Sequence, residues 1–268
     1  MKHVIFASYG NDSVALIQWA KDQELEEVVV LYNQTGWASE DWETRATDCE
    51  RWVESLGFEN SRTKSIGMEA LVKKKKGWPR QGMQFCTYEL KILPTATWMQ
   101  EKDPRKLAIC LVGVRREESA NRANFPELEK ASENYGGRDV WAPLVDYTET
   151  DRDELLGRAG ITPLPTRSME CFPCINSNRT DLRELAKDAT RIEEIAKIED
   201  DMGFTANGKP RTMFRPYRHM GATGIREIVK WAVADRGAYT PTGEHDQGEE
   251  DLDDGTGGGG CNNAWCGI

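Results

Sequence analysis

The sequence predicts an α/β fold: a Rossmann-like, open, mainly parallel sheet with helices on both faces, followed by a helical C-terminal part and a flexible tail. Short apolar runs at residues 4–7, 27–32 and 107–114 are typical of strands that are buried on both sides. Amphipathic stretches separate these runs. Because parallel strands need long crossover connections, this alternation predicts a parallel sheet covered by helices.

Four stretches have the apolar spacing of helices: residues 13–25, 40–56, 181–202 and 221–234. The clearest apolar stripe is in the second and consists of Trp42, Ala46, Cys49, Val53 and Leu56. At the start of the third, Asp181 and Glu184 resemble a capping pair. We expect an α/β domain over residues 1–240 that becomes helical from about residue 181.

The composition is that of an ordinary soluble protein, with 38% hydrophobic and 30% charged residues in a chain of 268. No apolar run approaches the roughly 18–20 residues of a membrane span, so we expect a cytoplasmic protein without a membrane partner. The net charge of −10 is uneven. From Gly237 onward there are seven acids and no Lys or Arg, which leaves 38 acids against 35 bases in the body. A near-neutral body neither favours nor excludes nucleic acid.

A short polar loop, SYGNDS at residues 8–13, follows the first predicted strand. Ligands of open parallel sheets bind beyond the carboxyl ends of the strands, so this loop is the first candidate site. Its N–H groups, with the hydroxyls of Ser8 and Ser13, would surround an anion at the next helix. Gly10 would allow close approach, and Asp12 would cap the helix or organise the loop. The alternative is an ordinary turn with Asp12 or Ser13 as the N-cap.

A second polar segment, GVRREESANRA at residues 113–123, follows the strand predicted at residues 107–114. Arg115, Arg116 and Arg122 are suited to bidentate binding of phosphate or sulfate. Glu118 would orient a guanidinium. The alternative is a solvated helix start with internal ion pairs.

The loop at residues 8–13 resembles the pyrophosphate-binding loop, Ser-Gly-Gly-x-Asp-Ser, of the adenine-nucleotide alpha-hydrolase superfamily. That superfamily includes ATP-pyrophosphatases and phosphoadenosine phosphosulfate (PAPS) reductases. Tyr9 stands at the first glycine and adds bulk to the loop. After its second strand the superfamily often has Asp-Thr-Gly near the adenosine, of which Thr35 and Gly36 match and the aspartate does not.

Further segments are similar to sulfonucleotide reductases of the iron–sulfur type. In the motif Gly-x-Arg-x-x-Glu-Ser-x-x-Arg, which lies beside the sulfonucleotide in that family, the matching residues are Gly113, Arg115, Glu118, Ser119 and Arg122. Residues 86–94 resemble the stretch Cys-Thr-x-x-Leu-Lys-x-x-Pro, which implies that Lys91 contacts phosphate; a surface lysine is the alternative. Similar stretches at residues 141–151 and 160–174 extend the resemblance to about residue 185.

Seven cysteines in a cytosolic chain indicate metal or redox chemistry rather than disulfides. Cys171 and Cys174 form a Cys-x-x-Cys pair, which can direct two thiolates at one metal centre. The resemblance adds Cys86 as a third ligand of a [4Fe–4S] cluster, and Phe85 stands where the family has another cysteine. Zinc is the alternative, because four thiolates suit either centre.

Residues 241–260 are acidic and glycine-rich and predict a flexible linker to a cysteine-containing tail, residues 261–268. We expect Cys261 to complete the cluster and Cys266 to be the redox nucleophile. The ending Cys266-Gly267-Ile268 resembles that of PAPS reductases, but the family's preceding Glu and final His are absent. The two tail cysteines could instead form a disulfide or bind a partner. Cys49 and Cys110 lie in apolar patterns and are expected to be structural.

The resemblance implies a reductase of PAPS or adenosine phosphosulfate (APS), with thioredoxin or glutaredoxin releasing sulfite from Cys266. A second hypothesis is an ATP-pyrophosphatase that activates a nucleic acid or small molecule for sulfur transfer. A third is a non-catalytic nucleotide-binding protein with structural zinc. The lysine run at residues 73–76, with Trp78 and Arg80, is either a solvated face or a channel for an anionic substrate or nucleic acid. We expect an oligomer.

Overall fold

The computed structural model describes residues 1–80, 82–120, 122–215 and 222–235, which form two compact units. The first unit contains Met1–Gly67 and Cys86–Cys171. The second contains Met68–Phe85 and, of the described residues, 172–235. The predicted linker and tail lie outside the described residues.

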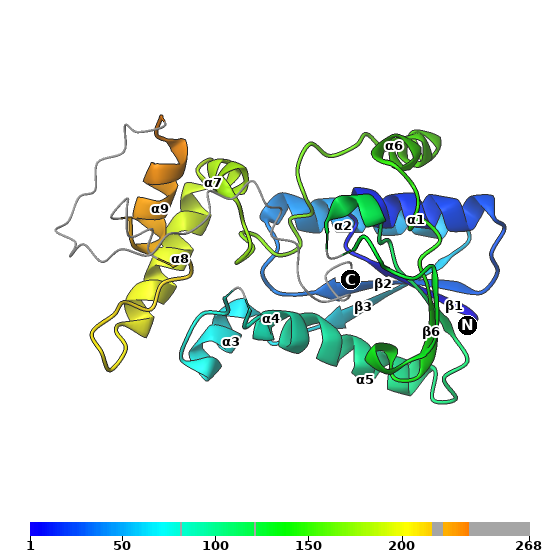
Figure 1. Ribbon diagram of the computed structural model, residues 1–268, viewed down its shortest axis with the longest axis horizontal. Helices are drawn as coiled ribbons and strands as arrows, with labels where there is room; N and C mark the ends of the chain where they lie inside the picture. The colour runs from blue at the N-terminus through cyan, green and yellow to red at the C-terminus, as the bar shows by residue number, and fades with distance from the viewer. Residues whose placement is uncertain (81, 121, 216–221, 236–268) are drawn as a thin grey trace. The chain divides into compact units, whose positions relative to one another are not determined.

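A six-stranded sheet in the order β3-β2-β1-β4-β6-β5 forms the centre of the first unit (Figure 1). Its strands are β1 (His3–Ala7), β2 (Val28–Gln34), β3 (Glu59–Lys64), β4 (Ile109–Leu111), β5 (Leu128–Ser132) and β6 (Arg138–Trp141). All neighbouring strands pair in parallel except β5, which runs antiparallel to β6. The predicted open, mainly parallel sheet is therefore confirmed.

Helices cover both faces of this sheet, as predicted. Helices α1 (Asn11–Asp22) and α2 (Glu40–Ser55) lie on one face and α5 (Leu93–Lys102) on the other (Figure 1). Helix α6 (Glu149–Arg158) packs against α1. Alternate residues of β1 enter opposite cores, because successive side chains of a strand point to opposite faces. Shorter helical elements are α4 (Phe85–Thr87), η1 (Tyr88–Ile92), η2 (Arg116–Glu118) and η3 (Glu133–Tyr135).

Several strands differ from the expectation. Strand β3, with sequence ENSRTK, carries no apolar run because it is an edge strand with mostly half-exposed side chains. Strand β4 covers only part of the predicted residues 107–114, since Leu107 is exposed before the strand begins. Strands β5 and β6 were not predicted.

The second unit contains α3 (Met68–Lys75), α7 (Arg179–Leu185), α8 (Ala189–Met202) and α9 (Gly224–Val233). The single helix predicted at residues 181–202 is wrong: Asp188 begins a new helix by accepting a hydrogen bond from the Arg191 N–H. The capping partner of Asp181 is Asn178 and not Glu184. Among the described helices, none has the length and apolarity that crossing a bilayer requires.

Candidate functional site

Three of the predicted binding segments leave the sheet at the same edge. Because β1, β2 and β4 are parallel neighbours, their carboxyl ends lie side by side. Residues 8–13 follow β1, residues 35–37 follow β2, and residues 112–122 follow β4. This edge is where ligands bind in open α/β sheets.

The loop after β1 is held by its own polar groups. Gly10 is the N-cap of α1, so neither Asp12 nor Ser13 takes that position. The Ser13 hydroxyl donates to the Gly10 carbonyl at 3.1 Å, and the Gly10 N–H points to Ser8 Oγ at 3.4 Å. The Trp42 indole of α2 donates to the Ser8 carbonyl at 3.1 Å. The first turn of α1 therefore starts from a fixed loop.

Tyr9 does not add bulk to the loop, contrary to the expectation. Its side chain is fully buried in the core, where its ring lies 5.4 Å from that of Tyr32 and its hydroxyl donates to Asn60 at 3.5 Å. Burial raises the pKa of Tyr9. The backbone reaches this arrangement through a φ of 57°, a left-handed value that favours glycine. Arg45 fixes it by donating from Nε to the Tyr9 carbonyl at 2.9 Å.

A segment that we call the strap, residues 164–171, runs along this edge of the sheet. The Asn11 side chain and the Leu164 backbone exchange two hydrogen bonds of 3.0 and 2.9 Å. A Cβ on Gly10 would lie 3.1 Å from Ser168 Cβ, so an alanine there would push the strap away by a few tenths of an ångström. The strap continues to the start of α2, where the N–H of the N-cap residue Ser39 donates to the Met169 carbonyl at 3.1 Å. No local pattern in the sequence predicts these contacts.

An ion pair joins the loops after β1 and β4. Arg115 is buried and donates from Nε to Asp12 Oδ1 at 2.6 Å. A Cβ on Gly113 would lie 3.0 Å from the Asp12 carbonyl oxygen, so glycine is needed where the two loops meet. Arg152 of α6, which sequence reasoning missed, is also buried and lies within electrostatic reach of Asp12 and Arg115.

The rest of the arginine-rich segment is ordered by internal contacts. Glu118 accepts the Arg115 N–H at 2.8 Å and forms an ion pair with Arg122. Ser119 ends η2, and its carbonyl accepts the Arg122 N–H at 2.9 Å. Arg116 pairs with Asp146. The alternative of internal ion pairs thus describes part of this segment.

Thr35 and Gly36 shape the loop after β2. The Thr35 hydroxyl donates to the Glu170 carbonyl of the strap at 2.6 Å and accepts the Trp37 N–H at 3.2 Å. Gly36 has a φ of 65°, and a Cβ there would lie 2.8 Å from the Cα of Gly67. Close backbone packing therefore requires this glycine.

Lys91 lies on η1 and forms an ion pair with Glu170 of the strap. Both side chains are largely buried. Burial raises the pKa of Glu170, and the charge of Lys91 partly offsets this. The surface-lysine alternative is wrong, because Lys91 is 12% exposed.

The predicted metal ligands are only partly described. Cys86 is buried and Cys171 half-buried in the first unit, Cys174 belongs to the second unit, and Cys261, like Cys266, lies outside the described residues. Within the described part of the chain, no group of three or more His, Cys, Asp or Glu side chains is arranged to hold a metal ion. Cys86 and Cys171 belong to the same unit, and the cluster stays a prediction.

Cys49 and Cys110 are structural, as expected. Both are buried, and burial raises the pKa of Cys49 to about 11 and that of Cys110 to about 12. Neither thiol is therefore a nucleophile at neutral pH.

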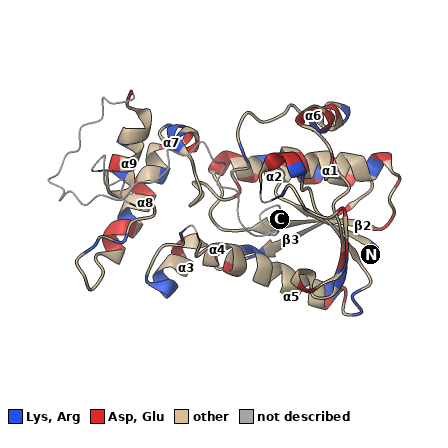
Figure 2. Ribbon diagram, in the orientation of Figure 1, with Lys and Arg blue, Asp and Glu red and all other residues tan. Residues whose placement is uncertain are grey.

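The lysine-rich end of α3 is visible in blue in Figure 2. Lys73 forms ion pairs with Glu69 and Asp201, and Lys75 lies over the Phe85 ring. Trp78 is buried, so its ring is not available to stack on a base of a nucleic acid.

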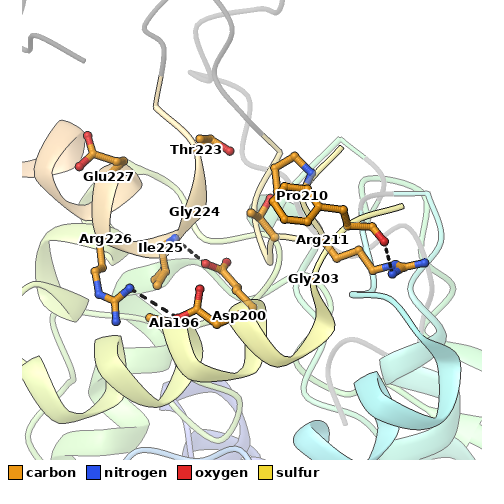
Figure 3. Close-up of a pocket in the computed structure, with 13 residues that line it drawn as sticks. Ala196, Asp200, Gly203, Pro210, Arg211, Thr223, Gly224, Ile225, Arg226 and Glu227 are labelled. Carbon is orange, nitrogen blue, oxygen red and sulfur yellow. Dashed lines mark hydrogen bonds and ion pairs between the residues drawn. The ribbon is translucent and has the colours of Figure 1, made fainter. Parts of the chain in front are cut away.

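A pocket of about 390 Å³ lies in the second unit between α8, α9 and residues 203–212 (Figure 3). It opens at the N-terminus of α9. There Glu199 accepts the N–H groups of Ile225 and Met213, both at 2.8 Å, and burial raises its pKa. An internal carboxylate thus occupies the position that an anion would take at this helix.

The family model named phosphoadenosine phosphosulfate reductase domain matches residues 2–181 of this chain. The chain belongs to the phosphoadenosine phosphosulfate reductase domain family. This match covers the whole sheet and every loop of the candidate site described above. The predicted family is confirmed, and the iron–sulfur type stays a prediction.

Individual relatives are more distant. An uncharacterized 37.8 kDa protein of Escherichia phage 186 is 31% identical over 188 residues, and the match covers 60% of this chain and 54% of that one. The chain thus spans about half the length of the curated relative that it matches. Among solved structures, NMN synthetase from Francisella tularensis has a TM-score of 0.46 at 13% identity, covering 86% of this chain and 83% of that chain. PAPS reductase from Candida auris has a TM-score of 0.43 at 11% identity, covering 61% and 75%.

Proposed function

We propose that this chain binds an adenine nucleotide at residues 8–13 and reduces a sulfonucleotide, PAPS or APS. The family match supports both the nucleotide and the substrate class. The observation that carries the site is the Asp12–Arg115 ion pair, because it joins the loop after β1 to the arginine-rich loop after β4. An anion between these loops would meet N–H groups and guanidinium groups together.

The roles of the residues follow from their chemistry. Ser8, Gly10, Asp12 and Ser13 would hold the phosphates at the first turn of α1, with Thr35 and Gly36 beside the adenosine. The sulfate would lie near the cationic side chains of Arg115, Arg122 and Lys91, in a loop shaped by Glu118 and Ser119. These cations would stabilise the negative charge that develops on the leaving phosphate.

The proposed reaction transfers the sulfonate group to a thiolate. The Cys266 thiolate attacks sulfur, a sulfur–sulfur bond forms, and the bond between sulfur and the phosphate oxygen breaks. The nucleotide leaves as adenosine bisphosphate from PAPS, or as AMP from APS. One thiol of reduced thioredoxin or glutaredoxin then attacks the Cys266 sulfur and expels sulfite. Its second thiol resolves the mixed disulfide, so the partner supplies two electrons and becomes oxidised.

We also propose that Cys86, Cys171, Cys174 and Cys261 hold a [4Fe–4S] cluster, which would supply electrostatic stabilisation near the sulfate. The support is the Cys-x-x-Cys spacing and the family resemblance. Iron, sulfide and zinc analysis of the anaerobically purified chain tests this. Four iron and four sulfide per chain are expected, with both lost in Cys171→Ser, whereas one zinc without sulfide would refute the cluster.

The reaction itself is tested with reduced, anaerobic protein, thioredoxin and either PAPS, APS or ATP. We expect the unmodified protein to form sulfite and the Cys266→Ser variant to form none. A Cys110→Ala variant serves as the control, because that thiol is buried and protonated. Binding of nucleotide without any turnover would instead support a non-catalytic protein.

A second candidate is the ATP-pyrophosphatase that activates an acceptor for sulfur transfer. The residue before Cys266 favours it, since Trp265 stands where PAPS reductases have Glu. Pyrophosphate release from ATP, without sulfite from PAPS or APS, would select this alternative.

A further inference from the structure

The Lys91–Glu170 pair has one feature that the proposed function does not use. Glu170 is 4% exposed, and its Oε1 accepts the Lys91 ammonium. Its other oxygen, Oε2, is buried and has no hydrogen-bond partner among the described residues. Buried carboxylate oxygens are nearly always hydrogen-bonded, so this pair is incompletely satisfied on its acidic side.

The strap does not depend on this ion pair for its position. The Glu170 carbonyl accepts the Thr35 hydroxyl at 2.6 Å, and the next residue, Cys171, forms a β-bridge with Trp37. These contacts therefore fix the backbone of Glu170 at the carboxyl end of β2.

Lys91 is anchored separately. One turn later on the same helical segment, the Thr95 hydroxyl donates to Asn33 of β2 at 2.9 Å. The backbone of Lys91 is thus held, while its side chain has four rotatable bonds and ends in a compact ammonium. Of the two partners, Lys91 is the one that can turn toward a ligand.

We propose that Glu170 is a positioning residue that sets the affinity of the nucleotide site. It holds the Lys91 ammonium as a neutral pair, and the anionic groups of a bound nucleotide compete with its carboxylate for that ammonium. The inference rests on the proposed function, since it needs an anionic nucleotide at this edge of the sheet. It predicts that the site favours ligands with several negative charges, because only these can replace the interaction that Lys91 loses with Glu170.

The test is calorimetric titration of PAPS into the reduced, anaerobic full-length protein and its variants. Glu170→Gln keeps the shape of the side chain and removes its charge, so PAPS should bind about tenfold more tightly. Lys91→Met should bind about tenfold more weakly. In the Lys91→Met background, Glu170→Gln should change the affinity by less than about twofold, because Glu170 acts through Lys91.

Asp103→Asn is the matched control. It neutralises another buried carboxylate that pairs with a cation in the same unit, at the opposite end of the strands. Its affinity for PAPS should equal that of the unmodified protein. Thermal midpoints of all variants identify any that do not fold, and Glu170→Asp, which weakens the pair but keeps the charge, should give an intermediate gain.

The outcomes separate the two proposals. If the unmodified protein binds PAPS and Glu170→Gln binds it equally or less tightly, the role of Glu170 is refuted and the proposed function stands. If Glu170→Gln raises the affinity for PAPS equally in the unmodified and the Lys91→Met backgrounds, Glu170 acts by repelling the anion directly. That result would also refute its role as a positioning residue. If the unmodified protein binds neither PAPS, APS nor ATP, the proposed function itself fails.

Discussion

Two buried ion pairs lie at opposite ends of the sheet, and they differ in how completely they are hydrogen-bonded. At the amino end, Arg138 donates to Asp103 at 2.7 Å, and the carboxylate also accepts the N–H groups of Leu107 and Ala108. The Arg138 guanidinium donates further to three backbone carbonyls. At the carboxyl end, Glu170 has an oxygen without a partner among the described residues. We call the first pair the closed pair, because both carboxylate oxygens and the guanidinium are hydrogen-bonded, and its role is structural. The second pair lies among the candidate ligand-binding loops and can exchange partners.

The largest expected effect comes from breaking the closed pair. Arg138→Met leaves the Asp103 carboxylate buried without its cation, so the free energy of unfolding should fall by about 3–5 kcal/mol. Urea denaturation measures this. Lys130→Met, which breaks the exposed pair with Asp139, is the control and should lower the unfolding free energy by no more than about 1 kcal/mol. Equal effects of the two substitutions would contradict the structural role of the amino-end pair.

At the carboxyl end of the sheet, stability and PAPS binding should depend on the distance between the loops after β1 and β4 as well as on their charges. In Gly113→Ala the new Cβ meets the Asp12 backbone and pushes the two loops apart, which should lower stability by about 1–3 kcal/mol and weaken PAPS binding. Denaturation and calorimetry measure the two effects. Gly157→Ala is the control, because a Cβ there meets no described atom within 4 Å and helix α6 should gain up to about 1 kcal/mol. Unchanged PAPS binding in Gly113→Ala would show that the two loops do not share a ligand.

The closed pair also predicts a pH dependence of stability. Burial alone would raise the pKa of Asp103, but hydrogen bonds from Arg138, Leu107 and Ala108 outweigh it and lower the pKa. The folded protein therefore holds this proton less tightly than the unfolded chain, whose Asp has a pKa of about 3.9. The stabilisation is present above that pH and is lost as the pH falls below it.

Unfolding free energies of the unmodified protein and Asp103→Asn, measured from pH 2.5 to 6, should converge toward acid pH. A constant difference across this range would mean that the charge of Asp103 contributes nothing.

The smallest effect concerns thiols away from the site. Because the pKa of Cys49 is about 11 and that of Cys110 about 12, iodoacetamide at pH 8 should leave both unmodified in the folded protein and modify both in urea. Mass spectrometry of the labelled peptides measures this. Rapid labelling of Cys110 without urea would contradict its burial in strand β4.

The sequence predicted the parallel sheet and the loops of the site because both depend on local patterns. Apolar runs mark buried strands, and the carboxyl-end rule then brings residues 8–13 and 113–122 together. Edge strand β3 was not predicted, because half-exposed strands need no apolar run. The break between α7 and α8 at Asp188 was not predicted, because the apolar stripe continues across it.

Other features were not predictable because they depend on contacts between residues far apart in the chain. Glu170 meets Lys91 across 79 positions, and the buried Tyr9 ring packs against Tyr32 of β2. No spacing within the sequence encodes either contact.

Hydrogen–deuterium exchange with and without PAPS tests the central claim most directly. The account predicts slower exchange in peptides covering residues 8–14 and 113–119 when PAPS is added, and no change in those covering residues 196–212 around the pocket of the second unit. Protection confined to residues 196–212, or no protection in the presence of saturating PAPS, would contradict a nucleotide site at the carboxyl end of the sheet.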